Sequence, residues 1–462
     1  MSRRRSLPPG PRGRRLTPRR TPQDNVRVAA AWVVERTLAS ASPAAGYLRG
    51  VMDRFEERDQ ALLQELVYGT LRWLRRIDHV LAAASHRRFE EIEQPLRAPL
   101  RIAAYQLLFL ERVPPYAAVD EAVEQAGYLT HRGGASFVNA VLRRIARSPR
   151  PGAWPVEERD PVRRLAVELS HPDFLVQRWC DRFGHERTQR LLAANNTPKP
   201  MHLLAFRDRG GRELLAEALI DEGLEVEPSA LSPLGLIVRA GNPLTTRSFA
   251  QGDCYVQDEA AQVAALLPPP AGGERVLDVA ASPGGKSLAL VAWEPGLRPV
   301  LADRSLQRLG PLRENLRRLG RGLPVVAADG ASPPFDGGFD RVVLDLPCSG
   351  TGTLRKHPEL KWRLSEGEIG RLAQQGRRLL AAAAPLLAPG GRLVAITCSI
   401  EAEENEELIA GAEGGLAQLR PVDLAASTPA PADRGLEAPG RWRLLPGGDH
   451  DGFTVQVLER RR

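Results

Sequence analysis

The stretch Val276-Leu277-Asp278-Val279-Ala280-Ala281-Ser282-Pro283-Gly284-Gly285-Lys286-Ser287 decides the fold of this chain. Its apolar start predicts a buried strand, its small residues predict a tight turn, and a helix is expected to begin near Lys286. Further apolar runs predict strands at 299–302, 325–328, 341–344 and 392–396, and helical patterns between them include 306–319 and 369–387. Such alternation predicts a parallel sheet flanked by helices.

The turn at 280–286 has the features of a ligand loop. Small side chains let a ligand approach the backbone, and the free amides at a helix start favour a carboxylate or a phosphate. Asp303 ends the next predicted strand, where an acid can hold ribose hydroxyls, and Asp329 and Asp345 follow later strands. The turn is neither a GxGxxG nor a P-loop sequence, so it indicates neither a nicotinamide nor a triphosphate. An ordinary strand–helix connection is the alternative interpretation.

Two cysteine-bearing turns, Asp345-Leu346-Pro347-Cys348 and Thr397-Cys398-Ser399, each follow a predicted strand. Residues just past the ends of parallel strands line the ligand crevice of such a sheet. Four basic residues near Cys348 favour a thiolate and would equally suit a phosphate backbone: Arg355, Lys356, Lys361 and Arg363. A paired thiol site beside a ligand loop indicates covalent catalysis. The alternatives are core packing for Cys398 and a flexible loop with an incidental Cys348.

The length of 462 residues and the apolar content of 43% allow about three domains with buried cores. No run approaches the roughly 18 apolar residues of a membrane span, and no apolar segment that could be a signal peptide follows the N-terminal arginines. We expect a soluble, cytoplasmic protein, and nothing in the sequence requires more than a monomer. The four cysteines show no CxxC spacing, so neither a metal site nor a disulfide scaffold is predicted.

The net charge of +8 is concentrated at the N-terminus, where the first 20 residues hold eight arginines and no acid. This segment is predicted to be a basic tail that suits a polyanionic partner, or else a solvated, disordered tail without function. Only four of the 64 basic side chains are lysines, and a lysine retained in this background indicates a chemical requirement: Lys199, Lys286, Lys356 and Lys361. The acidic run 401–406 after Cys398 is interpreted mainly as a helix N-terminus.

The region 25–147 shows apolar stripes at helical spacing and no convincing strand, which predicts an all-α domain. One stripe is expected to form a single helix through Leu62, Leu63, Leu66, Val67, Leu74, Ile77 and Leu81. A proline-containing linker follows at 147–155, and residues 156–255 mix helical and short-strand patterns.

Together these segments resemble the cytosine-5 RNA methyltransferases that use two cysteines. The family's first motif, roughly Asp-x-Cys-Ala-Ala-Pro-Gly-Gly-Lys-Thr, is similar to 278–287, with Ala280 in place of the motif cysteine and Ser282 in place of an alanine. The segments Pro347-Cys348-Ser349-Gly350-Thr351-Gly352 and Thr397-Cys398-Ser399 match its most specific motifs. Residues 248–258 look like the family's lead-in to the catalytic domain, and Asp451-Gly452-Phe453 resembles its closing signature.

The resemblance also implies the domain organisation. It is similar to the subgroup in which a NusB-like helical RNA-binding domain precedes a Rossmann-like class I methyltransferase domain, with Ser136-Phe137-Val138-Asn139-Ala140-Val141-Leu142 as the most recognisable helical piece. The expected parts are a basic disordered tail (1–24), the NusB-like domain (25–150), a connecting and RNA-binding subdomain (151–255), and the S-adenosylmethionine-dependent domain (256–462).

The activity implied by the resemblance is methyl transfer from S-adenosylmethionine to C5 of a cytosine in small-subunit (16S) ribosomal RNA. Cys398 would form a covalent adduct with C6 of the base, and Cys348 would assist release. The cofactor would be held by Asp303 at its ribose, Asp329 near its adenine, Asp345 at the cofactor–base junction, and a methionine cradle of Ala280, Ala281, Ser282, Pro283, Gly284, Gly285 and Lys286.

Three other functions stay open at this point. A related enzyme could methylate cytosine C5 in transfer RNA with the same residues. A small-molecule methyltransferase would share the cofactor site, although the helical domain and the basic tail would have no role in it. A non-catalytic, NusB-like RNA-binding assembly factor would not need the paired cysteines.

Overall fold

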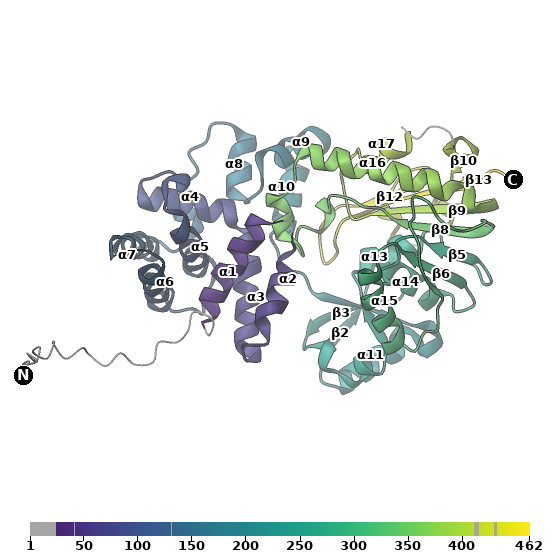
Figure 1. The fold of residues 1–462 in the computed structure, drawn as a ribbon, viewed down its shortest axis with the longest axis horizontal. Helices are drawn as coiled ribbons and strands as arrows, with labels where there is room; N and C mark the ends of the chain where they lie inside the picture. Colours follow the sequence, from purple (N-terminus) through teal and green to yellow (C-terminus); the bar gives the residue numbers. More distant parts are fainter. Residues whose placement is uncertain (1–24, 41, 131, 411–414, 429–431) are drawn as a thin grey trace, which may run out of the picture. The chain divides into compact units, whose positions relative to one another are not determined.

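The computed structural model describes residues 25–40, 42–130, 132–410, 415–428 and 432–462 (Figure 1). The predicted basic tail, 1–24, lies outside the described residues. The chain divides into two compact units, one that ends at Val156 and one that begins at Glu157. Among the described residues, no helix combines the length and the apolar character that crossing a membrane requires.

The first unit is helical throughout its described residues, as predicted. Its helices are α1 (Val26–Ala39), α2 (Ala44–Met52), α3 (Glu57–Arg72), α4 (Leu74–Ser85), α5 (Gln94–Phe109), α6 (Pro115–Leu129) and α7 (Arg132–Arg147). Their apolar stripes pack into one core. The prediction of a single helix through residues 62–81 is wrong, because Trp73 (φ −104°, ψ 16°) separates α3 from α4.

The second unit begins with three helices and a small sheet. The helices are α8 (Pro161–Glu168), α9 (Asp173–Phe183) and α10 (His185–Asn195). The antiparallel sheet has the order β2-β3-β1-β4, with strands β1 (Met201–Ala205), β2 (Glu225–Pro228), β3 (Gly235–Ala240) and β4 (Cys254–Val256). Helix α11 (Gly211–Asp221) packs Leu215 and Leu219 against this sheet, and the short α12 (Arg247–Ala250) precedes β4.

The large sheet has the order β11-β12-β13-β9-β8-β5-β6-β7. All five predicted strands form and run parallel: β5 (Arg275–Asp278), β6 (Arg298–Asp303), β7 (Val325–Ala327), β8 (Phe339–Asp345) and β9 (Leu387–Thr397). Four later strands, which were not predicted, extend this sheet in antiparallel pairs: β10 (Leu419–Pro421), β11 (Leu436–Ala438), β12 (Arg441–Leu444) and β13 (Phe453–Arg460). The short link between β12 and β13 permits only an antiparallel pair.

Helices cover both faces of the large sheet (Figure 1). Val276, Val343 and Val394 pack with α13 (Glu259–Ala265), α14 (Gly285–Trp293) and α15 (Leu306–Arg318). Their sequence neighbours Leu277, Val342 and Leu393 point to the other face, toward α16 (Glu366–Ala383) and α17 (Glu406–Ala410). Full burial of each such side chain is worth about 1.5–3 kcal/mol. This doubly covered sheet is the Rossmann-like domain that was predicted.

Helix α16 ends earlier than the pattern 369–387 predicts. Pro385 lies two residues after its last residue, Ala383, and proline has no N–H group for the helical hydrogen bond. Leu387 therefore begins β9.

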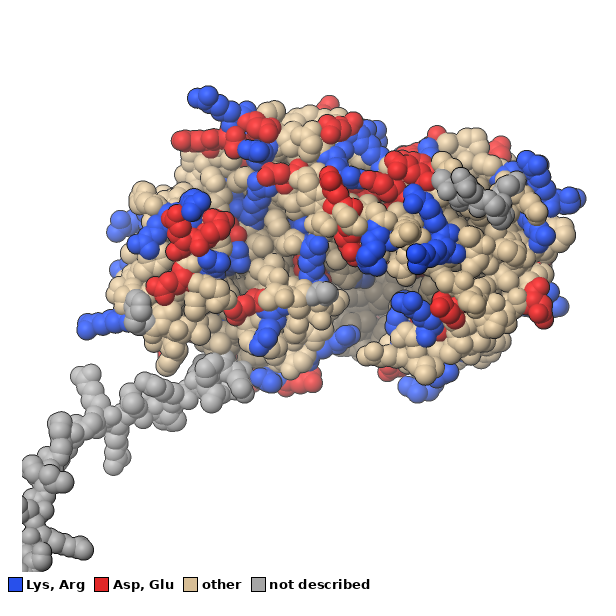
Figure 2. Space-filling view, turned by 45° about the horizontal axis from the view of Figure 1, so that its top comes forward, with Lys and Arg blue, Asp and Glu red and all other residues tan. Residues whose placement is uncertain are grey.

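Positive and negative charges nearly balance outside the N-terminal segment. Because residues 1–24 contain eight arginines and one acid, they account for seven of the eight net positive charges. Figure 2 shows basic and acidic side chains interleaved on the visible face rather than gathered in one patch. Attraction of a polyanion by residues 25–462 must therefore depend on where individual side chains lie.

Candidate active site

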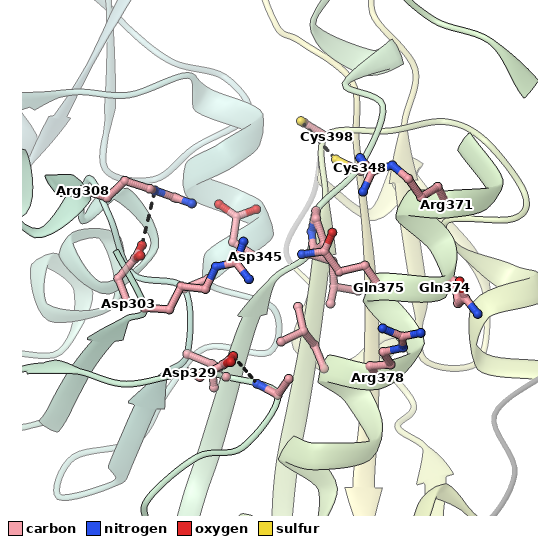
Figure 3. Close-up of a pocket in the computed structure, with 18 residues that line it drawn as sticks. Asp303, Arg308, Asp329, Asp345, Cys348, Arg371, Gln374, Gln375, Arg378 and Cys398 are labelled. Carbon is pink, nitrogen blue, oxygen red and sulfur yellow. Dashed lines mark hydrogen bonds and ion pairs between the residues drawn. The ribbon is translucent and has the colours of Figure 1, made fainter. Parts of the chain in front are cut away.

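A cavity of about 780 Å³ lies at the carboxyl ends of the parallel strands (Figure 3). Its size is within the range of roughly 300–1,000 Å³ that is usual for ligand sites. Six of the predicted site residues line it: Ala280, Asp303, Asp329, Asp345, Cys348 and Cys398. The other predicted cradle residues are not part of the cavity wall: Ala281, Ser282, Pro283, Gly284, Gly285 and Lys286.

The loop before α14 is held by its neighbours. Gly284 has φ +113°, a backbone conformation that side chains disfavour, and it caps α14. Ser282 donates its hydroxyl to the Arg308 carbonyl oxygen at 2.5 Å, and the Arg308 guanidinium donates to the Ser282 carbonyl oxygen at 3.1 Å. The serine that departs from the family motif thus fastens this loop to α15.

Asp303 lines the cavity with one carboxylate oxygen that has no hydrogen bond. One carboxylate oxygen accepts the Ser305 amide at 3.0 Å. The other, Oδ2, is buried without a hydrogen bond and lies 3.4 Å from Nε of Arg308. Leaving a buried acceptor unpaired costs about 1–3 kcal/mol, so a ligand hydroxyl at this position would be favoured. Asp329 is exposed and accepts the Ala331 amide at 3.0 Å.

Lys286 lies behind the cavity wall and pairs with Asp345. Its Nζ is 3.0 Å from Oδ2 of Asp345 and 5.4 Å from the centre of the Phe453 ring. Burial lowers the pKa of Lys286, but the pairing with Asp345 outweighs burial and raises that pKa overall. Lys286, one of the four lysines, therefore provides a positive charge beside the cysteines.

The sulfur atoms of Cys348 and Cys398 are 3.4 Å apart, and both cysteines are free of disulfides. The hydrogen bond between them, followed by burial, raises the pKa of Cys348 well above its ordinary value. The same hydrogen bond lowers the pKa of Cys398 although burial opposes it, and Lys286 lowers it further. These opposite shifts make Cys398 the more readily ionised of the two sulfurs and favour Cys348 as the hydrogen-bond donor.

The positive charge that was expected near the cysteines from Arg355 and Lys361 comes instead from Lys286. Arg355 is buried and donates to the carbonyl oxygens of Thr197 and Gly448, at 3.1 and 2.9 Å. Lys361 is buried and donates to Asn196 at 2.7 Å. These two cations hold backbone segments together, and the cation that favours the Cys398 thiolate is Lys286.

The closing Asp451-Gly452-Phe453 segment joins both cysteine loops. The Gly452 amide donates to the Gly352 carbonyl at 2.7 Å, and the Gly352 amide donates to the Cys398 carbonyl at 2.9 Å. Asp451 shares the ammonium group of Lys199 with Asp258, which caps α13. Lys199, the lysine without a place in the predicted motifs, thus ties the start of the catalytic domain to its last strand.

Three parts of the chain match known families. Residues 264–459 match the family described as 16S rRNA methyltransferase RsmB/F, and residues 27–147 match the NusB family. Residues 171–245 match the ferredoxin-like domain of RsmF/B-like methyltransferases.

Similar proteins span nearly the whole chain. The ribosomal RNA small subunit methyltransferase B of Pseudomonas syringae pv. tomato is 37% identical, over 94% of this chain and 96% of its own. The probable enzyme of the same name from Bacillus subtilis is 34% identical, over 77% and 80% of the two chains. This chain belongs to the ribosomal RNA small subunit methyltransferase B family. The predicted membership in this family is confirmed.

Solved structures agree with this membership. The crystal structure of PH0851 is 26% identical and superimposes with a TM-score of 0.77 over 96% of this chain and 99% of its own. NSun6 from Pyrococcus horikoshii, at 19% identity and a TM-score of 0.54, shares the fold over 62% of this chain and 97% of its own. A NusB domain followed by a Rossmann-like methyltransferase domain, as predicted, is confirmed.

In this member of the methyltransferase B family the acids after Cys398 are ion-pair partners. Helix α17 begins only at Glu406, so the interpretation of the acids of 401–406 as mainly charges at a helix N-terminus holds for Glu406 and is wrong for Glu401, Glu403 and Glu404. Arg178 of α9 donates to Glu401 at 3.1 Å and to Glu403 at 2.7 Å, and Trp179 donates to Glu401 at 2.9 Å. Helix α9 therefore anchors the loop that carries the nucleophile candidate.

Glu404 is a buried carboxyl that the motifs do not single out. It accepts the amide and the hydroxyl of Ser349, at 2.8 and 2.7 Å, next to Cys348. Burial raises its pKa to about 7. Its contacts join the two cysteine loops across 55 residues of sequence, which is why no local pattern reveals them.

Glu404→Gln is expected to make the protein less sensitive to pH. Between about pH 4.5 and 7 the folded protein holds a proton on Glu404 that the unfolded chain has released, so stability falls as pH rises through this window. Relative to wild type, the variant should gain roughly 3 kcal/mol across the window. Urea unfolding at pH 5 and pH 8 measures this gain. The exposed Glu407→Gln is the control, and equal pH profiles for Glu404→Gln and wild type would contradict the prediction.

Proposed function

We propose that this protein transfers a methyl group from S-adenosylmethionine to C5 of a cytosine in small-subunit ribosomal RNA, through a covalent bond between Cys398 and C6 of the base. The observation that carries the proposal is the pair of sulfur atoms 3.4 Å apart, with opposite pKa shifts, at the wall of the cavity. In such a pair, the thiolate can attack the base and the neighbouring thiol can assist the release of the base.

The residues around the cavity fit the cofactor. When bound, S-adenosylmethionine supplies an electrophilic methyl group. Oδ2 of Asp303, which makes no hydrogen bond in the protein, would accept hydrogen bonds from ribose hydroxyls, and Asp329 would lie near the adenine. Ala280 lines the cavity just before the start of α14, where backbone amides suit the carboxylate of the methionine part. Asp345 would lie between the cofactor and the base.

The chemistry requires a nucleophile because C5 of cytosine is itself a poor one. The Cys398 thiolate adds to C6, which makes C5 electron-rich enough to form a bond with the methyl group. The C5 proton is then lost to water, which restores the C5–C6 double bond as the C6–sulfur bond breaks and Cys398 leaves as a thiolate. The Cys348 thiol, whose sulfur lies 3.4 Å from that of Cys398, would donate to the departing thiolate and stabilise it. The target base must be unpaired or flipped out, because C6 is inaccessible within a base stack.

The proposal extends to the rest of the chain. The NusB-like domain at 25–150 and the connecting subdomain at 151–255 would bind RNA beside the catalytic domain at 256–462. The basic tail at 1–24 would add attraction to phosphates, which depends on salt. We place the enzyme in the cytoplasm, acting as a monomer.

Asp303→Asn is expected to weaken S-adenosylmethionine binding about 10- to 100-fold, as for the loss of a hydrogen bond to a charged group. The neutral side chain keeps the shape of the site but accepts more weakly from ribose hydroxyls. Calorimetric titration with the cofactor measures the loss. Asp336→Asn, an exposed position outside the cavity wall, is the control, and unchanged affinity in Asp303→Asn would exclude Asp303 from the cofactor site.

The proposed function is tested by incubating the protein with unmodified small-subunit ribosomal RNA and labelled cofactor, then mapping the modified base. The expected product is 5-methylcytosine in that RNA. Methylation of transfer RNA instead would show the related activity. No binding of S-adenosylmethionine in calorimetry would favour a non-catalytic assembly factor.

A further inference from the structure

One face of α16 forms a wall of the cavity and has no place in the proposed mechanism. Four polar side chains at helical spacing lie on it: Arg371, Gln374, Gln375 and Arg378. The residues that α16 buries against the sheet are different ones: Ile369, Ala373, Gly376, Leu380 and Ala383. We call the first set the α16 wall. Its side chains are not required for packing, because Arg371, Gln374 and Arg378 are exposed and Gln375 is half-buried.

The side chains of the α16 wall are available to a ligand. Arg371 pairs with Glu368 of the same helix at 2.7 Å, an exposed ion pair of the kind that contributes little to stability. Within the described residues, Gln374, Gln375 and Arg378 make no hydrogen bond or ion pair with the protein. Two guanidinium groups and two amides therefore border the cavity without strong protein partners.

The two sides of the cavity carry different groups. Figure 3 shows Asp303 and Asp329 on one side, with Arg308 beside Asp303, and the α16 wall on the other, with Arg371 reaching toward the cysteine pair. The two aspartates suit the hydroxyl groups and the positive charges of the cofactor. The α16 wall suits anions, and arginine matches phosphate geometry with two parallel hydrogen bonds.

We infer that the α16 wall binds the RNA strand at the target nucleotide, and this inference rests on the proposed function. A cytosine placed against Cys398 would have its backbone phosphates within reach of this wall, on which Arg371 lies near the cysteine pair and Arg378 lies further along α16 (Figure 3). Arginine contacts with phosphates position the strand, while amide groups such as those of Gln374 and Gln375 read base edges. The arginines thus set affinity, and the glutamines set the preference for neighbouring bases.

The test compares RNA binding by Arg371→Gln/Arg378→Gln with that of Arg317→Gln, an exposed position on α15 outside the cavity wall. Binding of a single-stranded small-subunit ribosomal RNA fragment is measured at several salt concentrations, and S-adenosylmethionine binding by calorimetry. Two lost phosphate contacts should weaken RNA binding roughly 10- to 100-fold at low salt. They should also reduce the slope of log affinity against log salt by about 1.4. Cofactor affinity should stay at the wild-type value.

A second variant separates positioning from base reading. Gln374→Ala/Gln375→Ala should keep the wild-type salt slope but change the relative rates on fragments that differ in the base next to the target. A salt slope of the double arginine variant equal to that of Arg317→Gln would overturn the inference, as would a loss of cofactor affinity with RNA binding intact. Wild-type protein that fails to methylate RNA would instead refute the proposed function itself.

Discussion

Cys398→Ala is expected to abolish methyl transfer, with a loss of roughly 10⁴-fold or more, as for removal of an enzyme nucleophile. Without the thiolate nothing adds to C6, and C5 does not become reactive. The fold should persist, because the side chain lies at the cavity wall and alanine is smaller. Transfer of labelled methyl groups to small-subunit ribosomal RNA measures the loss.

Cys348→Ala is expected to give the opposite phenotype, a protein that stays attached to its RNA. Attack by Cys398 would still occur, but the departing sulfur would lack its hydrogen-bond donor at 3.4 Å. A denaturing gel should show a protein–RNA adduct, and the double variant Cys348→Ala/Cys398→Ala should show none. Cys180→Ala, outside the cavity wall, is the matched control and should behave as wild type. Normal turnover by Cys348→Ala without an adduct would refute this division of roles.

Gly352→Ala is expected to inactivate the enzyme although residue 352 does not line the cavity. A Cβ atom there would lie 2.3 Å from the Gly452 carbonyl oxygen and 2.9 Å from the Cys398 carbonyl oxygen. Both neighbours are backbone atoms, so the two cysteine loops and the closing segment must move apart. Overpacking of this kind costs about 1–3 kcal/mol, and a displacement of about 1 Å in a catalytic group can cost 10²-fold in rate.

The control for Gly352→Ala is Gly367→Ala in α16, where a Cβ atom meets nothing within 4 Å. This helical substitution should stabilise the protein by about 0.4–1 kcal/mol and leave methylation unchanged. Thermal unfolding and methyl transfer are measured for both variants. Wild-type activity in Gly352→Ala would show that the contact among the three segments does not position the cysteines.

The strand pattern predicted the catalytic centre because the site follows from local rules. Parallel strands with apolar cores end at one edge, so Cys348 and Cys398 had to meet Asp303 and Asp329 there. The family comparison confirms the fold, whereas the roles of the individual site residues stay predictions. The antiparallel strands β10–β13 were not foreseen, because their pairing is set by short links and by β13 inserting beside β9.

The supports of the site could not be predicted from sequence. Arg178 meets Glu403 across 225 residues, and Lys199 meets Asp451 across 252 residues. Local periodicity in the sequence does not indicate such distant partners. A run of acidic residues gives the same sequence pattern whether it lies at a helix N-terminus or pairs with arginines. The expected thiolate setting failed for the same reason, since Arg355 and Lys361 turn toward distant carbonyl and amide groups.

The pairing of Lys199 with Asp258 and Asp451 has a consequence for how the enzyme folds while it is synthesised on the ribosome. Every element from α13 to the turn before β13 must be synthesised before Asp451 exists to meet Lys199. Until then Gly352 lacks Gly452, and β9, the strand that presents Cys398, has an open edge where β13 belongs. A growing chain can thus fold its helical domain early, yet its reactive cysteines become organised only late in translation. Unfinished chains would be poor catalysts and, through that open edge, prone to pair with other strands.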